Sequence, residues 1–104
     1  MGHAQFDFEA TLWLHPGEAG WHFVTLPPEL ADDIDGQVGE RAGFGSIPVE
    51  ATIGTSTWKT SLFPDKAAAS FVLPVKRAVR QKEQIQADSV VSVRLRLGLV
   101  TTLT

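Results

Sequence analysis

Hydrophobic and polar residues alternate along much of the chain. In "FDFEATLWL", the residues on one face are Phe6, Phe8, Ala10, Leu12 and Leu14. Successive side chains of a strand point to opposite sides of a sheet, so this pattern predicts a half-buried strand. "IPVEATI" and "VVSVRLRL" repeat the pattern, with inward-facing residues expected at Ile47, Val49, Ala51, Ile53, Val91, Val93, Leu95 and Leu97.

Three further segments favour strands. After the turn residues of "HPGEAG", the segment "WHFVTL" is expected to pair back as a hairpin, with Trp21 and Phe23 on one face. "SFVL" predicts a short strand. "TWKTSLF" alternates less cleanly, and its two faces hold Trp58, Thr60 and Leu62 on one side and Lys59, Ser61 and Phe63 on the other.

Two segments that follow prolines predict short helices. In "LPPELADDIDGQVG", a proline in the first turn and early acidic residues suit a helix start, and Gly36 or Gly39 would end the helix. In "LPVKRAVRQKEQI", hydrophobic residues recur at the spacing of one helical face, while Arg77 and Arg80 lie opposite. The expected stripe is Val75, Ala78, Val79, Lys82 and Ile85.

The two helices reveal an internal repeat. "FVTLPPELADDI" and "FVLPVKRAVRQ" both run from a strand through Leu-Pro into a helix, and an alternating strand follows each. The half repeats cover about 6–53 and 56–99. We therefore predict a mainly β fold, a small closed six-stranded barrel with a pseudo-twofold internal repeat and two short helices. Closure would remove exposed sheet edges.

Composition fits one domain over residues 1–104. The chain is 43% hydrophobic and 20% charged with a net charge of -3, as expected of a globular protein. We expect no membrane span, because no apolar run approaches about eighteen residues, and we expect a cytoplasmic location, because the first residues lack a signal-peptide pattern. The absence of cysteine excludes disulfides, thiolate metal sites and thiol nucleophiles. No cofactor or metal site is predicted.

Charge is distributed unevenly between the halves. Residues 1–57 carry about -8, with Arg41 as their one basic residue, and residues 58–104 carry about +5. Either the halves attract each other within one fold, or a basic face serves an anionic partner. The sequence pI of 5.5 favours the first interpretation.

Catalytic and metal motifs find little support in the sequence. No serine lies in a Gly-x-Ser-x-Gly elbow. His15, Glu18 and His22 flank one loop, but their spacing matches no established metal-ligand pattern. The glycines of "GERAGFGSIPV" lead into a strand, whereas phosphate-binding glycine loops lead into a helix.

The stretch "TSTWKTSLFP" is the candidate site. Neither of its faces is purely apolar, so one face suits a partly polar groove. We expect Trp58 to offer a stacking surface and Thr60 or Ser61 to donate hydrogen bonds, with Arg77 and Arg80 as an anion-holding fork. In the alternative interpretation, Trp58 only closes the end of the barrel.

These residues predict a non-enzymatic module that binds a small ligand or a protein partner. The first alternative is a nucleic-acid-binding barrel, whose basic residues would be Lys76, Arg77, Arg80, Arg94 and Arg96. The second alternative is an enzyme, which would need a convergent acid, base or nucleophile set that no spacing in the chain demands. Both a monomer and a homodimer are compatible with the sequence.

Three segments carry a resemblance to a known family. "RAGFGSIPVEATIGTSTWKTSLFP", "FVLPVKRAVRQ" and "ADSVVSVRL" closely resemble the bacterial family called domain of unknown function 1905, over Phe6 to Leu97. The most specific piece is Trp58-x-Thr60-Ser61-Leu62-Phe63-Pro64, followed by Leu73-Pro74 and Arg80. The chain departs from the family pattern where that pattern usually has glycine, at Ala67, Ala69 and Ala87.

The resemblance implies a double-split β-barrel. That class includes dimeric DNA-binding domains of transcription regulators and antitoxins, in which two half-barrel chains interleave. Here one chain would hold both halves, in agreement with the internal repeat. Some relatives also carry a domain similar to bacteriocin-protection proteins. The family implies no activity and no catalytic residues.

Overall fold

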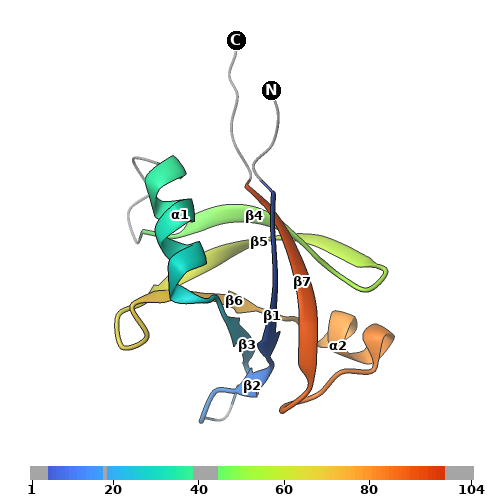
Figure 1. Cartoon of the computed structure of the whole chain (residues 1–104). Coiled ribbons are helices and arrows are strands. Elements are labelled where there is room, and N and C mark those ends of the chain that lie inside the picture. The colour runs from blue at the N-terminus through green and yellow to red at the C-terminus, as the bar shows by residue number, and fades with distance from the viewer. Residues whose placement is uncertain (1–4, 18, 39–44, 98–104) are drawn as a thin grey trace.

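The computed structural model describes residues 5–17, 19–38 and 45–97 of the chain. These residues form a mainly β fold in which a curled sheet of seven strands is accompanied by two helices (Figure 1). All strand pairs are antiparallel, in the order β1-β7-β4-β5-β6-β3-β2. The strands are β1 (Gln5–Thr11), β2 (Trp13–Leu14), β3 (His22–Thr25), β4 (Ile47–Ile53), β5 (Ser56–Asp65), β6 (Ser70–Pro74) and β7 (Val90–Leu97).

The first predicted strand is divided at Leu12. β1 pairs with β7 and β2 pairs with β3, so β1 and β2 stand at opposite ends of the strand order. The Leu12 amide donates to the Ser89 carbonyl at 2.8 Å, and the Leu12 carbonyl accepts from the Asp88 amide at 2.8 Å. The expectation that Leu14 points inward is wrong, because the chain changes partners here and leaves Leu14 50% exposed.

The division at Leu12 changes the strand number. The described residues form seven strands rather than six, and the predicted closed six-stranded double-split barrel is not confirmed. β5 also serves two neighbours: its first part, from Ser56 to Leu62, pairs with β4, and Phe63 to Asp65 pair with β6. Strands that change partners along their length let the sheet curl around its own core.

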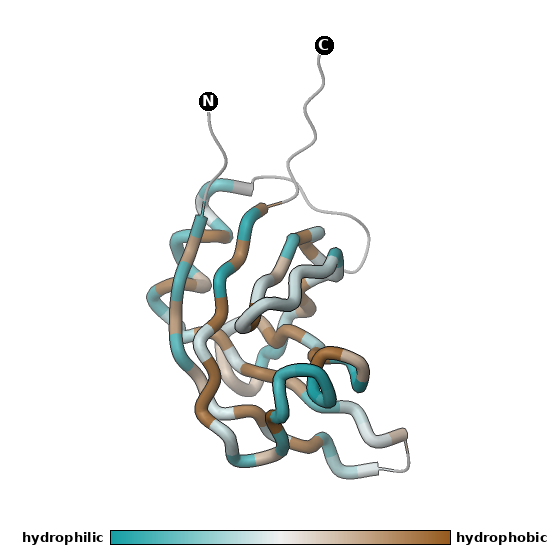
Figure 2. Tube along the Cα trace, turned by 90° about the vertical axis from the view of Figure 1, so that its right-hand side faces the viewer, coloured by the Kyte–Doolittle hydropathy of each residue, from teal (hydrophilic) through white to brown (hydrophobic). Residues whose placement is uncertain are grey.

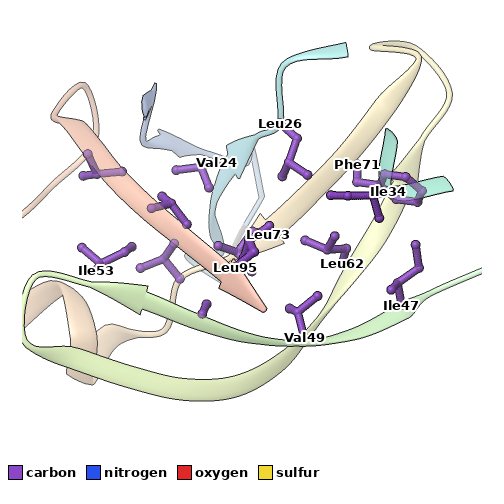
Figure 3. Packing of buried hydrophobic residues seen from close by; sticks show 14 of the residues in the cluster. Val24, Leu26, Ile34, Ile47, Val49, Ile53, Leu62, Phe71, Leu73 and Leu95 are labelled. Atoms are coloured by element: carbon purple, nitrogen blue, oxygen red, sulfur yellow. The ribbon is translucent and has the colours of Figure 1, made fainter. Parts of the chain in front are cut away.

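Alternation along β4 and β7 is confirmed. All eight residues predicted to face inward on these strands are buried, while their neighbours on β7 are exposed. Figure 2 shows the resulting alternation of hydrophilic and hydrophobic positions along the strands. Figure 3 shows Leu62, Leu73 and Leu95 meeting inside the curled sheet, with Ile34 of the first helix beside Phe71. Burying each such side chain contributes about 1.5–3 kcal/mol of transfer free energy.

Helix α1 (Pro28–Val38) follows the first Leu-Pro pair. The Pro27 carbonyl accepts hydrogen bonds from the amides of Leu30 and Ala31, both at 3.0 Å. Ala31 and Ile34 are buried against the sheet. The helix passes through Gly36, so the first expected end is wrong: Gly36 has no positive φ, and an isolated glycine inside a helix costs only about 1 kcal/mol. The other expected end, Gly39, lies outside the described residues.

Helix α2 (Arg77–Glu83) is shorter than α1. The Lys76 carbonyl accepts from the amides of Val79 and Arg80, both at 3.1 Å. Gln84 ends the helix in a left-handed conformation, with φ of 57°. The expected apolar stripe is confirmed at Val75, Val79 and the half-buried Ile85. It is wrong at Ala78 and Lys82, which are exposed because so short a helix buries only a narrow face.

The turn between β5 and β6 contains a strained alanine. Ala69 has φ of 50°, a left-handed conformation that glycine adopts without a steric penalty. The Ala69 amide donates to the Lys66 carbonyl at 3.1 Å, and the Ala67 amide donates to Asp65 Oδ1 at 3.1 Å. The turn therefore keeps a glycine-like geometry although Ala69 stands where the resembling family usually has glycine.

Candidate ligand groove beside β5 and α2

A groove of about 400 Å³ lies where β5, the residues before β3 and the start of α2 meet. Trp58 lies at its base, since this side chain is 9% exposed and belongs to the hydrophobic core. The groove is lined by Ala19, Gly20, Trp21, His22, Trp58, Lys59, Thr60, Phe63, Pro74, Val75, Lys76, Arg77 and Arg80.

Four of the five predicted ligand residues come together in this groove. Trp58 and Thr60 reach it from β5, and Arg77 and Arg80 reach it from α2. Ser61 does not line it; this half-buried residue lies opposite Pro48 in the β4–β5 ladder. Alternation along β5 does not explain this division, because Lys59 and Phe63, which share a face with Ser61, also line the groove.

The Arg80 side chain is held in place by the backbone. Its Nε donates to the Val75 carbonyl at 3.1 Å, and the side chain is half-buried. Within the described residues, the terminal nitrogens of Arg80 have no ion pair or hydrogen bond of their own. A guanidinium anchored through Nε keeps its two outer nitrogens for a planar anion.

The groove is strongly positive. Besides Arg80, the exposed residues Lys59, Lys76 and Arg77 line it, and none of these forms an ion pair in the part of the chain that the structure describes. No carboxylate is among the described lining residues. Cations gathered without counter-charges repel one another and raise the local affinity for an anion.

The five predicted nucleic-acid residues divide into two groups. Lys76, Arg77 and Arg80 line the groove. Arg94 on β7 pairs with Asp7 at 3.0 Å, and Arg96 lies 3.7 Å from Glu50. The structure therefore does not bring Arg94 and Arg96 to the groove, and each already has a carboxylate partner.

A second hollow of about 350 Å³ adjoins the groove. Its aromatic side chains, which we call the aromatic patch, are His15, Trp21, Phe23 and Phe63. The rings of Trp21 and Phe23 stack at 5.9 Å with an interplanar angle of 10°. Trp21 and Phe63 line both hollows and are 52% and 41% exposed. The sequence placed Trp21 and Phe23 on one face, but it offered no reason to assign them to the same site as Arg77.

Glu83 connects α2 to the turn between β4 and β5. Its carboxylate accepts from Ser56 Oγ at 2.6 Å and from Thr55 Oγ1 at 3.0 Å. These hydrogen bonds, that of Ser56 foremost, lower the pKa of Glu83, although partial desolvation opposes the shift. Gly54 leaves room for the carboxylate, since a Cβ there would overlap it. No sequence motif marks this connection, which fixes α2 against β5 and so shapes the groove.

The sequence offers little support for a metal site or a phosphate-binding glycine loop, and parts of both segments lie outside the described residues. Glu18, Gly39 and Gly43 lie outside the described residues. Within the described ranges, no group of three or more histidine or acidic side chains could hold a metal ion. His22 Nδ1 lies 2.8 Å from the Gly20 carbonyl, so it donates its proton there. No helix of these ranges is long and apolar enough to cross a membrane.

The curled sheet, the two helices and the cationic groove define a small, mainly β class of protein. The chain belongs to the family described as Domain of unknown function (DUF1905), whose model matches residues 8–95. No curated protein matches the chain significantly. The resemblance drawn from the sequence motifs is confirmed by the family match.

Proposed function

We propose that the protein is a non-enzymatic binding module that holds a small anionic ligand in the groove between β5 and α2. One observation carries the proposal: Lys59, Lys76, Arg77 and Arg80 converge on a groove whose described lining contains no carboxylate. Thr60 would donate a hydrogen bond, and Trp58 would close the base of the site. The anchored guanidinium of Arg80 supports a fixed geometry for the anion.

Thermal unfolding with a panel of small anions tests this proposal. A ligand at about 100 times its Kd stabilises the folded state by about 2.7 kcal/mol, which raises the Tm by more than about 10 °C in a domain of this size. Arg77→Gln should remove most of the shift. Lys82→Gln is the matched control, because Lys82 lies on the same helix but does not line the groove. Equal shifts in both variants would contradict the proposed site.

Nucleic-acid binding is the second candidate. It is favoured by the position of Lys76, Arg77 and Arg80 beside the exposed aromatic rings. It is disfavoured by the ion pairs of Arg94 and Arg96, two of the five residues predicted for this role. A short duplex whose affinity falls steeply with salt and is lost in Arg94→Gln would support it.

We also propose that the curled sheet closes as a six-stranded double-split barrel with a pseudo-twofold axis. Counting β1 and β2 as one strand makes the strand order circular. The Leu26 amide donates to the Phe71 carbonyl at 3.0 Å, and the Val75 amide donates to the His22 carbonyl at 2.9 Å, as a twofold axis would require. Amide hydrogen exchange tests closure: the Leu12 amide should exchange as slowly as amides in the middle of β4.

A further inference from the structure

We propose that the anionic ligand is a free nucleotide, a planar base joined through a sugar to phosphate. The phosphate would bind Arg77 and Arg80, and the base would stack on the aromatic patch. This inference rests on the proposed function, and it adds a planar base to the anionic ligand proposed there. It concerns both hollows rather than the groove alone.

The two hollows adjoin and share two aromatic side chains. Trp21 and Phe63 belong to the linings of both. One face of Trp21 is stacked on Phe23, yet Trp21 remains 52% exposed, so a second planar ring has access to it. Large exposed aromatic rings are unfavourable in water and stack well on nucleobases.

The groove supplies the complementary chemistry for phosphate. Arg77 and Arg80 carry planar guanidinium groups that match phosphate oxygens in a bidentate geometry. Trp21 and Phe63 line the same groove as these two arginines. One ligand can therefore touch cationic and aromatic side chains together, which a simple inorganic anion would not do.

Size and charge favour a single nucleotide over a strand of nucleic acid. The hollows, about 400 and 350 Å³, fall at the lower end of the range of small-molecule sites. The whole chain carries a net charge of -3, which repels a long polyanion. Arg94 and Arg96 do not extend the unpaired positive surface, since both pair with carboxylates.

Calorimetric titration with three probes tests the inference: adenosine monophosphate, adenosine and ribose phosphate. We expect the monophosphate to bind at least about ten-fold more tightly than either fragment, because stacking on one aromatic ring and the charged contacts each contribute that much. Trp21→Leu should weaken the nucleotide about ten-fold and leave ribose phosphate unchanged. Arg77→Gln should weaken both phosphate-bearing probes.

Two controls and three contrary outcomes complete the experiment. Leu14→Ala removes an equally exposed apolar side chain outside both hollows, and Lys82→Gln removes a cation of α2 outside the groove; neither should change the affinities. If ribose phosphate binds as tightly as the nucleotide, and Arg77→Gln weakens it, the nucleotide inference is overturned while the anion site stands. If no anion binds in an Arg77-dependent way, both the nucleotide inference and the proposed anion site are overturned. Affinity that appears only with oligonucleotides, and grows with their length, overturns the free nucleotide.

Discussion

The two helices start with the same backbone hydrogen bonds but differ in the side chains that follow. Each helix follows a Leu-Pro or Pro-Val step from a strand, and a carbonyl at its start accepts the same two amide hydrogen bonds: Pro27 for α1 and Lys76 for α2. In α1 the residue four positions after that carbonyl is Ala31, which is buried. In α2 the corresponding residue is Arg80, which faces a groove. The same backbone arrangement thus supports apolar packing at α1 and polar contacts at α2.

The hollows beside the helices differ in the same way. The one beside α1 is about 220 Å³ and includes the carboxylates of Asp32, Asp35 and Asp65 together with one cation, Lys66. The groove beside α2 is nearly twice as large and collects only cations among its described charged residues. The two hollows therefore differ in charge, and the α2 side is the one suited to an anion.

The largest effect is expected from the apolar contact of α1. Ile34→Ala should lower the free energy of unfolding by about 2–5 kcal/mol, because it opens a cavity beneath a fully buried side chain. Asp33→Ala, on the exposed side of the same helix, should change it by less than about 0.5 kcal/mol. Urea unfolding measures both. A loss for Ile34→Ala no greater than that of its control would mean that α1 does not secure the core.

The polar contact of α2 should have a smaller effect that depends on pH. Glu83→Gln replaces an ionised acceptor of two hydroxyl hydrogen bonds by a neutral one and should lower the Tm at neutral pH. The pKa of Glu83 is lower in the folded state than in the unfolded chain, so its stabilisation is present above the unfolded pKa and is lost as pH falls through the folded pKa.

Thermal unfolding from neutral to acidic pH measures this difference. The wild type and Glu83→Gln should differ most at neutral pH and converge below the ordinary pKa of glutamate. Glu29→Gln, on the exposed first turn of α1, serves as the control for losing one carboxylate. A Tm difference between wild type and Glu83→Gln that does not shrink in acid would contradict the connection between α2 and the β4–β5 turn.

The sequence predicted features that depend on neighbouring residues and missed features that depend on contacts between distant residues. Strand alternation is local, so the inward faces of β4 and β7 were correct. The division at Leu12 was not visible, because it depends on hydrogen bonds to Ser89 and Asp88, far along the chain. The predicted repeat aligned Phe23 with Phe71 because the residue types match. The equivalent hydrogen bonds described above instead make Leu26 the counterpart of Val75.

The candidate site shows the same limit. Helical spacing alone put Arg77 and Arg80 together on α2, and the sequence motif marked Trp58 and Thr60. Phe63 belongs to the same motif, whereas Trp21 comes from a distant part of the chain, and the meeting of the two depends on how β3, β5 and β6 pair. Glu83 escaped notice because its partners, Thr55 and Ser56, are distant in sequence.

The smallest effect concerns the turn that precedes β6. Ala69→Gly should raise the free energy of unfolding by about 0.5–1 kcal/mol, since glycine adopts the left-handed φ of 50° without steric cost. The matched variant Ala67→Gly, at a position without positive φ in the same turn, should be neutral or slightly destabilising. Urea unfolding separates them, and equal changes for the two variants would argue against strain at Ala69.

The most direct test of the anion site compares the two hollows in one spectrum. Amide and indole resonances would be followed by NMR while inorganic phosphate is added to the full chain. We predict saturable shifts at Trp58, Thr60 and Arg77, and none at Ala31 or Asp32 beside α1. Equal shifts around both helices, or no shift at the α2 groove, would contradict the claim that this side of the molecule is the anion-binding site.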